Sequence, residues 1–264
     1  MTTYERRQSL LDMLRKQPGL RVLRLAQALD VSEGTVRNDL NALEEEGKLR
    51  RVHGGAVLNE PDQFQSHSFD RRHKENVAAK LAIAQGAARL VSDGDSIFVD
   101  ASSTGYYFAR SLALRKGLRV VTNGFEAAKE LAKNHSNNVI LLGGVVGYGS
   151  SSVTGLLSER ILEEFYFQKT FLACSGFSLE RGMTEVHLAE AQLKRKVIES
   201  TEKLFALVDS SKFGKEDLTP FARPEEIFYL FTDCGLSAAW AEALRRAGID
   251  YTSCEEEASS TPND

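Results

Sequence analysis

The chain has 264 residues, 42% of them hydrophobic, and a formal net charge of -4 at pH 7. This length suits one large domain or two of ordinary size, and the composition is that of a globular protein with a proper core. No run of 18 apolar residues is present, which excludes a membrane-spanning helix, and residues 1–7 lead into a helical pattern rather than an apolar secretion signal. We therefore expect a cytoplasmic protein.

The cysteines and histidines form no metal or disulfide pattern. Cys174, Cys234 and Cys254 are far apart without a CxxC pair, which excludes a disulfide framework and an ordinary zinc site. We expect small apolar residues in a reducing compartment, with a redox switch as the alternative. The histidines are scattered, which disfavours a metal-dependent sensor; they are His53, His67, His73, His135 and His187. No metal and no cofactor are expected.

The charge is unevenly distributed along the chain. Residues 1–57 carry ten Lys and Arg against eight Asp and Glu, whereas the remaining residues carry 23 basic and 29 acidic side chains. A mildly basic head on an acidic body is typical of a DNA-binding module joined to a module of another kind.

Two short helices are predicted near the N-terminus. The first covers residues 4–16 and ends before Pro18-Gly19, and the second covers residues 22–29. Their apolar positions at helical spacing are Leu10, Leu11, Leu14, Val22, Leu25, Ala26 and Leu29. Each helix therefore has one face that can be buried in a core.

A third helix is predicted to begin at Glu33, with Ser32 as its N-cap after a tight turn. Gly47 suits the left-handed position that follows a helix end. Residues 48–57 then form two short extended pieces around Gly54-Gly55, which suits a β-wing. Residues 1–57 thus match the plan of a winged helix-turn-helix DNA-binding domain.

In this plan the third helix enters the major groove. Burial of Val36, Leu40 and Leu43 turns the opposite face of the helix toward DNA. The expected DNA contacts on the helix and wing are Ser32, Thr35, Arg37, Asn38, Asn41, Arg50, Arg51 and His53. Arginine can bind guanine and asparagine can bind adenine through paired hydrogen bonds, while hydroxyls and wing cations can bind phosphates. The alternative is a helical bundle with a solvated polar face.

Two runs in this head resemble known motifs. Residues 32–40, Ser-Glu-Gly-Thr-Val-Arg-Asn-Asp-Leu, resemble the helix-turn-helix signature of the DeoR family of bacterial repressors. Residues 49–56 resemble the wing of the same family. The family usually has Arg-Arg-Asp-Leu where this chain has an asparagine at Asn38. The resemblance implies that the chain binds an operator. The asparagine at Asn38 implies that the base sequence of this operator cannot be taken from that of a relative.

Residues 58–69 lack periodicity and form the predicted linker, and residues 70–90 are predicted to form one long amphipathic helix. From residue 70 to residue 252 we expect an α/β domain with a largely parallel sheet, because strands and helices alternate. The predicted strands are 96–99, 119–122, 139–142, 170–174, 204–208 and 227–232, with helices at 106–114, 125–134, 158–165 and 186–202. Residues 253–264 are predicted to be an acidic, polar tail.

Polar residues and glycines follow five of these strands. In open α/β sheets, ligands bind beyond the carboxyl ends of the strands, which predicts one effector site. Its expected residues are Asp100, Ser102, Ser103, Thr104, Thr122, Asn123, Gly143, Gly144, Ser175, Gly176, Asp209 and Lys212. The hydroxyls of Ser102–Thr104 open a helix and can cradle an anion, to which Lys212 can add a positive charge. Asp100, Asn123 and Asp209 can bind hydroxyls, so the chemistry indicates a phosphorylated sugar or polyol.

Each of these features also has a structural alternative. The hydroxyls of Ser102–Thr104 could form only a helix cap, Gly143-Gly144 only a close turn, and Lys212 could be a surface lysine. Glu185 and Glu190 are expected on a helix surface or helix start rather than at the site. The convergence of five strand ends on one edge favours the binding site.

The body also resembles the DeoR-type sensor domain, which is similar to ribose-phosphate isomerase and related sugar-phosphate folds. The matching runs begin at Asp100, Val121, Leu142, Ser175, Gly182, Glu190 and Asp209, with Lys194 between the last two. The resemblance implies that Ser102–Thr104 and Lys212 hold phosphate and that Asp100 and Asn123 contact the sugar. Ser102 stands where family members commonly have glycine, which implies that the effector preference can differ.

We therefore expect a DNA-binding regulator, a repressor of a carbohydrate-metabolism operon whose operator binding responds to a phosphorylated sugar. Its partners are expected to be double-stranded operator DNA, the sugar phosphate and further copies of the chain in a dimer or tetramer, with no membrane contact. The alternative is a sugar-phosphate isomerase with an appended DNA-binding head. That reaction needs an acid and a base, and the nearby carboxylates are Asp100, Glu185, Glu190 and Asp209. We expect no catalytic residue.

Overall fold

The computed structural model describes residues 2–16, 20–52, 55–58, 69–147 and 150–255. The chain divides into two compact units, Met1–His67 and Ser68–Asp264, and each has its own hydrophobic core. None of the helices in the described ranges is long and apolar enough to cross a lipid bilayer.

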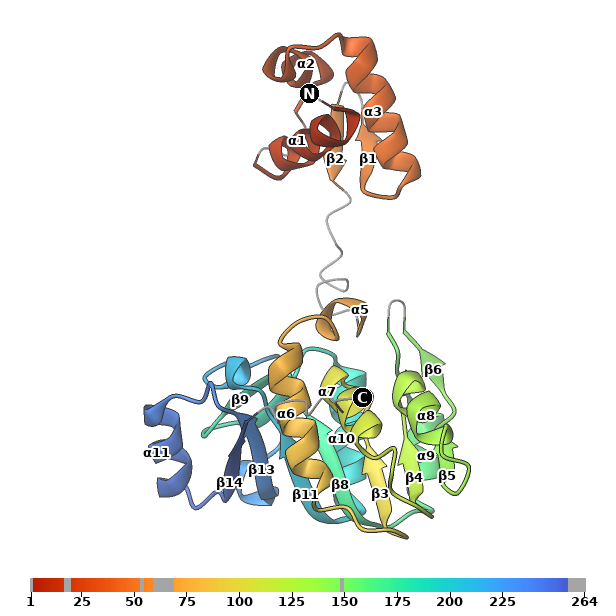
Figure 1. Cartoon of the computed structure of the whole chain (residues 1–264), viewed down its shortest axis with the longest axis vertical. Coiled ribbons are helices and arrows are strands. Elements are labelled where there is room, and N and C mark those ends of the chain that lie inside the picture. Colours follow the sequence, from red (N-terminus) through yellow and green to blue (C-terminus); the bar gives the residue numbers. More distant parts are fainter. Residues whose placement is uncertain (1, 17–19, 53–54, 59–68, 148–149, 256–264) are drawn as a thin grey trace, which may run out of the picture. The chain divides into compact units, whose positions relative to one another are not determined.

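The first unit is a three-helix domain with a two-stranded wing (Figure 1). Its elements are α1 (Thr3–Lys16), α2 (Val22–Leu29), α3 (Glu33–Glu45), β1 (Leu49–Val52) and β2 (Gly55–Leu58). Gly47 has a φ of 70°, so the predicted left-handed residue after α3 is confirmed. Pro18 and Gly19, expected to end the first helix, lie outside the described residues, as does most of the predicted linker.

The core of this unit is built from the apolar positions at helical spacing. Its fully or nearly fully buried members are Leu10, Leu11, Leu14, Val22, Leu25, Ala26, Val36, Leu40, Leu43, Leu49 and Ala56. Because one stripe of each helix is buried in this way, the opposite stripe of α3 is left to the solvent.

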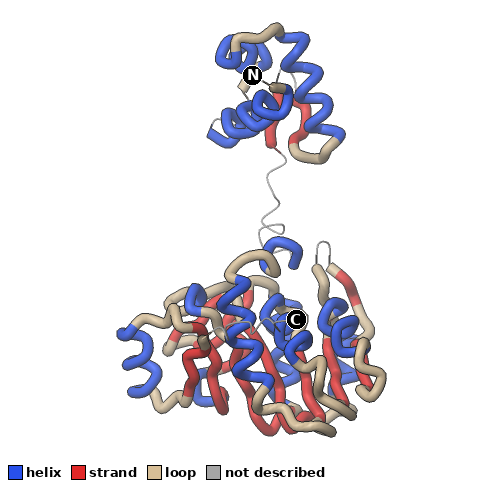
Figure 2. The backbone as a smooth tube through the Cα atoms, in the orientation of Figure 1, coloured by secondary structure: helices blue, strands red, loops and turns tan. Residues whose placement is uncertain are grey.

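The second unit contains a seven-stranded sheet in the order β14-β13-β11-β8-β3-β4-β5, and every neighbouring pair is parallel. Its strands are β3 (Ser96–Val99), β4 (Arg119–Thr122), β5 (Asn138–Leu141), β8 (Phe167–Ala173), β11 (Thr201–Leu207), β13 (Ile227–Asp233) and β14 (Tyr251–Cys254). Helices flank the strands on both sides (Figure 1, Figure 2). The predicted α/β class with a largely parallel sheet is confirmed.

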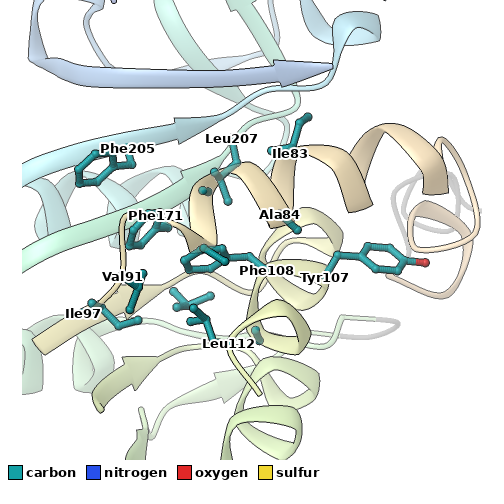
Figure 3. Close-up of a cluster of buried hydrophobic side chains, with 14 of the residues drawn as sticks. Ile83, Ala84, Val91, Ile97, Tyr107, Phe108, Leu112, Phe171, Phe205 and Leu207 are labelled. Atoms are coloured by element: carbon teal, nitrogen blue, oxygen red, sulfur yellow. The ribbon is translucent and has the colours of Figure 1, made fainter. Parts of the chain in front are cut away.

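The sheet has two faces, because alternate residues of a strand point to opposite sides. One face packs against α6 (Val77–Ala88), α7 (Ser103–Ser111) and α8 (Phe125–Ala132). The other packs against α9 (Leu156–Leu162), α10 (Leu188–Glu199) and α11 (Ala238–Arg246). On the first face the ring of Phe171 lies between those of Phe108 and Phe205, with centroids 4.2 and 5.0 Å away (Figure 3).

Shorter elements extend this framework. An antiparallel ribbon consists of β6 (Val145–Val146) and β7 (Val153–Thr154), and a three-stranded antiparallel sheet has the order β12-β10-β9. The strands of that sheet are β9 (Gly176–Ser178), β10 (Gly182–Glu185) and β12 (Thr219–Ala222). Two 3₁₀ turns are η1 (Ser210–Lys212) and η2 (Pro224–Glu226). The antiparallel sheet brings β10 next to the carboxyl end of β8, since Ser175 donates its backbone N–H to Thr184.

The prediction of one helix over residues 70–90 is wrong. The segment forms a short helix α5 (Phe69–Arg72), a turn, and then α6. Asn76 at the break has φ 51° and ψ 41°, a left-handed conformation that no α-helix tolerates. The Nζ of Lys80 donates to the carbonyls of Arg72 and Glu75, which the break leaves without helical partners.

Two boundary predictions are also corrected. Helix α10 ends at Glu199 rather than at residue 202, because Thr201 already pairs with Phe167 in the sheet. Ser253 and Cys254 were assigned to the tail but belong to β14, where Ser253 pairs with Thr232 of β13. In both places the pairing of a strand with its neighbour decides the conformation of a segment whose own pattern is ambiguous.

Candidate DNA-binding surface and effector site

Helix α3 begins with a side-chain cap. The Oγ of Ser32 accepts a hydrogen bond from the backbone N–H of Thr35 at 3.1 Å, and the two hydroxyl oxygens are 2.9 Å apart. Asn38 and Asn41 are exposed and Thr35 is half-buried, on the side of α3 opposite its buried apolar stripe. The side chains expected to read DNA are thus presented on one face of the helix.

Arg37 is exposed and forms an ion pair with Glu33, with 2.7 Å between Nη2 and Oε2. An exposed pair of this kind contributes little to stability, so the guanidinium can exchange Glu33 for a base or a phosphate at small cost. Asn41 accepts a hydrogen bond from the Arg51 guanidinium, and Glu44 accepts one from the Arg51 backbone at 2.7 Å. These bonds fix the wing strand β1 against α3.

Two predicted contacts on the wing are not described. His53 lies outside the described residues, and so does the side chain of Arg50, although its backbone belongs to β1. Asp39 is not among the predicted residues, and it is almost fully buried behind the helix face. Its carboxylate binds the Nε of Arg6 at 2.5 Å and the Nε of Arg7 at 3.2 Å, so it attaches α3 to α1.

The predicted effector residues surround the point where the sheet changes direction. Along the chain, β4 and β5 are added on one side of β3, whereas β8, β11, β13 and β14 follow on the other side. The junction of β3 and β8 is therefore the topological switch point, where α/β proteins bind ligands. Asp100, directly after β3, is fully buried there, and its Oδ2 accepts the backbone N–H of Ala173 at 3.0 Å.

The predicted hydroxyl loop caps α7. Ser102 donates to Asp100 from its hydroxyl at 2.6 Å and accepts from the N–H of Gly105 at 2.8 Å. Ser103 and Thr104 are buried in the first turn. A Cβ at Gly105 would lie 2.5 Å from the carbonyl oxygen of Asp100, so glycine is required by this close approach. The loop is both a helix cap and a set of hydroxyls and amides beside the switch point.

Lys194 of α10 is the centre of the site. Its Nζ lies 2.5 Å from Oε1 of Glu185, 3.0 Å from Oδ2 of Asp100 and 2.7 Å from the carbonyl oxygen of Ala173. Burial alone would lower the pKa of Lys194, but the charges of Glu185, Asp100 and Glu190 outweigh it and raise the pKa. Lys194 is therefore a permanent buried cation that holds two carboxylates at the ends of different strands.

The expectation of a helix surface or helix start holds for Glu190, which lies in the first turn of α10, and is wrong for Glu185, which ends strand β10. Both carboxylates reach the site. Burial would raise the pKa of Glu185, but the charge and hydrogen bond of Lys194 lower it, so this carboxylate is ionised. Ser175, one of the predicted residues, donates to Glu185 at 2.7 Å. Glu185 ends the short strand β10, and no spacing in the sequence places that strand beside β8.

Glu190 is in the first turn of α10, and burial raises its pKa above the ordinary value. It accepts a hydrogen bond from the hydroxyl of Ser152 and one from Nδ2 of Asn123 at 3.4 Å. Asn123 is almost fully buried, and its Oδ1 accepts the N–H of Ala101 at 3.0 Å. Asn123 and Glu190 thus form the β4 side of the site.

The remaining predicted residues have more local roles. Thr122 is buried and accepts the N–H of Gly124 at 3.0 Å. The carbonyl of Gly143 accepts the hydroxyl of Ser158 at 2.7 Å, and a Cβ at Gly144 would meet that same hydroxyl at 2.6 Å. Gly176 begins β9, where a Cβ would lie 2.5 Å from the carbonyl oxygen of Lys215. The turn alternative therefore accounts for Gly144, whereas a Cβ at Gly143 would meet only Leu157 at 3.8 Å, so the backbone does not require glycine there.

Asp209 and Lys212 follow β11 in the η1 turn. Asp209 is buried and accepts the N–H of Ser211 at 3.2 Å, while Lys212 is half-buried. No direct hydrogen bond connects them to Asp100, Ser102 or Asn123 among the described residues. Lys194 thus binds Asp100 directly and is linked through Asp100 to Ser102 and through Glu185 to Ser175. Asp209 and Lys212 form a second group at the same sheet edge.

Two family models match the chain, one over each unit. Residues 6–62 match a DeoR-like helix-turn-helix domain, and residues 75–234 match the DeoR C terminal sensor domain. Together they include the recognition helix, the hydroxyl loop, Lys194 and Lys212.

Relatives match over nearly their full length. The HTH-type transcriptional regulator YulB of Bacillus subtilis is 38% identical over 252 residues, 96% of this chain and 97% of the relative. The lactose phosphotransferase system repressor of Streptococcus mutans is 34% identical, covering 89% and 93%. The L-fucose operon activator of Haemophilus influenzae is 36% identical, covering 86% and 90%.

Among solved structures, ribose 5-phosphate isomerase A of Neisseria gonorrhoeae aligns with a TM-score of 0.38 and 17% identity, over 51% of this chain and 52% of that chain. A likeness of this degree carries no inference about function. The family models and the relatives agree over both units. The chain therefore belongs to the DeoR family of DNA-binding transcriptional regulators, whose members are regulators rather than enzymes.

Proposed function

We propose that this protein represses a carbohydrate-metabolism operon and that a phosphorylated sugar or polyol, bound at the carboxyl edge of the sheet, controls its operator binding. The observation that carries the proposal is the set of polar groups at the junction of β3 and β8. Asp100, Asn123 and Glu190 meet there beside the first turn of α7. A buried polar set at a switch point, in a regulator rather than an enzyme, is suited to binding a small polar ligand.

The sugar end of the ligand would be read by carboxylate and amide groups. A sugar hydroxyl both donates and accepts hydrogen bonds, and Asp100, Asn123 and Glu190 supply acceptors and one amide donor. The hydrogen bond between Asn123 and Glu190 is weak at 3.4 Å, so a sugar hydroxyl can replace it while Asn123 keeps its bond to Ala101 and Glu190 its bond to Ser152.

The phosphate would lie between the start of α7 and Lys212. The first amides of a helix have no helical acceptors and carry partial positive charge, which favours an anion. Lys212 has no ion-pair partner among the described residues and so has a free positive charge to offer.

Control of operator binding requires more than one head. Each chain carries one recognition helix, and operators of this kind contain repeated half-sites. Exposed aliphatic side chains gather at the β5 edge of the sheet, with Leu157 beside Gly143 and Val145 beside Gly155. The members of this patch are Ile140, Leu141, Val145, Val146, Leu156 and Leu157. We propose that a second copy of the chain covers it in the cytoplasm, because apolar patches mark interfaces.

A charge in this patch tests the oligomer. Sedimentation velocity should show a dimer or larger for the native chain and a monomer for Leu157→Glu, with Leu114→Glu as a matched control because Leu114 is also exposed. If Leu157→Glu still associates like the native chain, this patch is not the interface between copies of the chain.

A ligand screen tests the effector. Thermal unfolding of the full chain with a panel of phosphorylated and unphosphorylated sugars should show a higher Tm with at least one phosphorylated member, by mass action on the native state. Lys212→Ala should reduce that shift, while Lys215→Ala, an exposed neighbour, should not. Equal shifts with a sugar and its phosphate would refute the phosphate assignment.

A further inference from the structure

Residues 69–76, which comprise α5 and the turn before α6, form a segment that we call the hook. It contacts the η1 turn of the candidate effector site and helix α7, which the hydroxyl loop caps. Nδ2 of Asn76 lies 3.3 Å from Oδ1 of Asp209 and 3.2 Å from the hydroxyl of Ser211. The carbonyl of His73 accepts the hydroxyl of Tyr107 at 2.9 Å. In Figure 3 the ring of Tyr107 extends from α7 away from the other labelled core side chains.

Aromatic packing fixes the hook to the hydroxyl-loop helix. Phe69 is almost fully buried, stacks on His73 at 5.7 Å and meets Tyr106 edge-on at 5.9 Å. Tyr106 and Tyr107 belong to α7, whose first turn contains Ser103. The hook therefore connects the helix that follows the expected phosphate cradle to the η1 turn that carries Lys212.

Lys80 interacts electrostatically with two further cations, Arg72 of the hook and Lys212. Lys80 is only 4% exposed, and burial lowers its pKa to about 8, with Asp209 opposing the shift and the charges of Lys212 and Arg72 adding to it. Nε of Arg72 is buried and has no hydrogen-bond partner among the described residues. Lys80 is thus acted on by the positive charges of Lys212 and Arg72 and by the negative charge of the buried Asp209. Cationic side chains beside a buried guanidinium nitrogen that lacks a hydrogen-bond partner are suited to an incoming anion.

We infer that Arg72 of the hook and Lys80 of α6 complete the phosphate subsite with Lys212, so that the phosphate of the effector fixes the hook in place. This inference rests on the proposed function, since the anion is the phosphate of the proposed ligand. A phosphate dianion would pair with Arg72 through two oxygens and relieve the repulsion among the three cations.

The position of the hook in the chain gives this subsite a regulatory consequence. The hook lies between the DNA-binding head and the sensor body in sequence, and its bonds to Asp209 and Tyr107 connect it to the η1 turn and to α7. A ligand alters an equilibrium only by binding its two states differently. If phosphate binds the chain more tightly when the hook is in place than when it is released, the bound ligand favours the first state. The occupancy of the effector site then influences the segment that leads to the head.

The test uses the full-length protein and inorganic phosphate as the probe, titrated against chloride at constant ionic strength. Thermal unfolding measures the affinity for phosphate. Hydrogen exchange measures how strongly the backbone amides of residues 73–80 are protected. We expect phosphate to stabilise the native chain and to protect these amides. Arg72→Gln and Lys212→Ala should each weaken phosphate about tenfold or more. Arg71→Gln is the matched control, since Arg71 is on the same short helix and pairs with exposed Glu75.

The possible outcomes distinguish failure of this inference from failure of the proposed function on which it rests. If phosphate binding needs Lys212 but is unchanged in Arg72→Gln, the hook has no part in the subsite although the proposed function stands. If the native chain binds no phosphate, the phosphate assignment itself fails.

Lys80→Met can impair folding because Lys80 caps the break in the helix, so Arg72→Lys serves as the second variant. We expect it to regain part of the affinity lost in Arg72→Gln, and no gain would contradict a direct contact.

Discussion

The two units hold their functional side chains in opposite ways. In the DNA-binding head, Arg37, Asn38 and Asn41 are exposed on a helix whose stability comes from an apolar stripe on its other side. In the sensor body, Asp100 and Lys194 are buried in the fold and hold strand ends together. The head separates function from stability, whereas the body uses the same groups for both.

The proposed function explains this difference by the partner of each unit. DNA is a large, charged surface, and its recognition needs exposed donors that lose little on leaving water. A small polar ligand has to be surrounded, so its contacts are buried and need partners when the ligand is absent. Lys194 with Glu185 and Asp100 provides such partners in the body.

The largest effect should come from Lys194→Met in the body. Removing this cation leaves the carboxylates of Glu185 and Asp100 buried without their partner, which costs about 3–5 kcal/mol of unfolding free energy. Urea unfolding followed by circular dichroism measures the loss. Lys196→Met on the same helix is the control, because Lys196 is partly exposed and its ion pair with Glu163 should contribute little to stability. A loss below that of the control would mean that the buried cluster is not what joins β3, β8 and β10.

A smaller effect of a different kind is expected for Arg37→Ala in the head. The Tm should stay within error of the native value, because only an exposed ion pair with Glu33 is lost. Affinity for the operator should fall about 10- to 100-fold, the cost of a bidentate base contact. Fluorescence anisotropy with duplex DNA measures it, and Lys48→Ala, after the far end of α3, should bind nearly as the native chain does. A destabilised Arg37→Ala protein would break the contrast between the units.

The smallest effect concerns pH and Lys80. Its pKa of about 8 in the free protein should rise when a phosphate dianion binds beside it. Binding then takes up a proton, so phosphate affinity should fall as the pH rises through 8, where the free protein loses that proton. The ligand itself stays a dianion there, since the second pKa of a phosphate monoester is about 6. Calorimetric titrations between pH 7 and pH 9 should show the fall in the native chain and a flatter profile in Lys80→Met; identical profiles would exclude Lys80 from the subsite.

The same contrast explains how much of the molecule could be predicted. The head follows from local spacing, because Val36, Leu40 and Leu43 recur at helical intervals and Ser32 and Gly47 mark the helix ends. The strands of the body and their polar ends also follow from local patterns. These signals lie within one element and do not depend on which elements become neighbours.

The centre of the effector site could not be predicted in this way. From its sequence position Lys194 is an ordinary helix charge and Glu185 an acid at a helix surface or helix start. They become a cluster only because β8 pairs with β3 and β10 turns back beside β8. The break at Asn76 carries no glycine or proline signal either, and the contacts of Lys80 with the hook carbonyls stabilise it. Both features depend on tertiary contacts that override local preference.

The most direct test of the central claim is operator affinity with and without a phosphorylated sugar. Duplex DNA selected by the native chain from a random pool would be titrated with full-length protein, using the phosphorylated sugar that raises the Tm most. We predict that this ligand changes the operator Kd about fivefold or more in the native chain, the usual range of allosteric coupling, and leaves it unchanged in Lys212→Ala. A ligand that binds the native chain and yet leaves the operator Kd unchanged would contradict control of the head by the body.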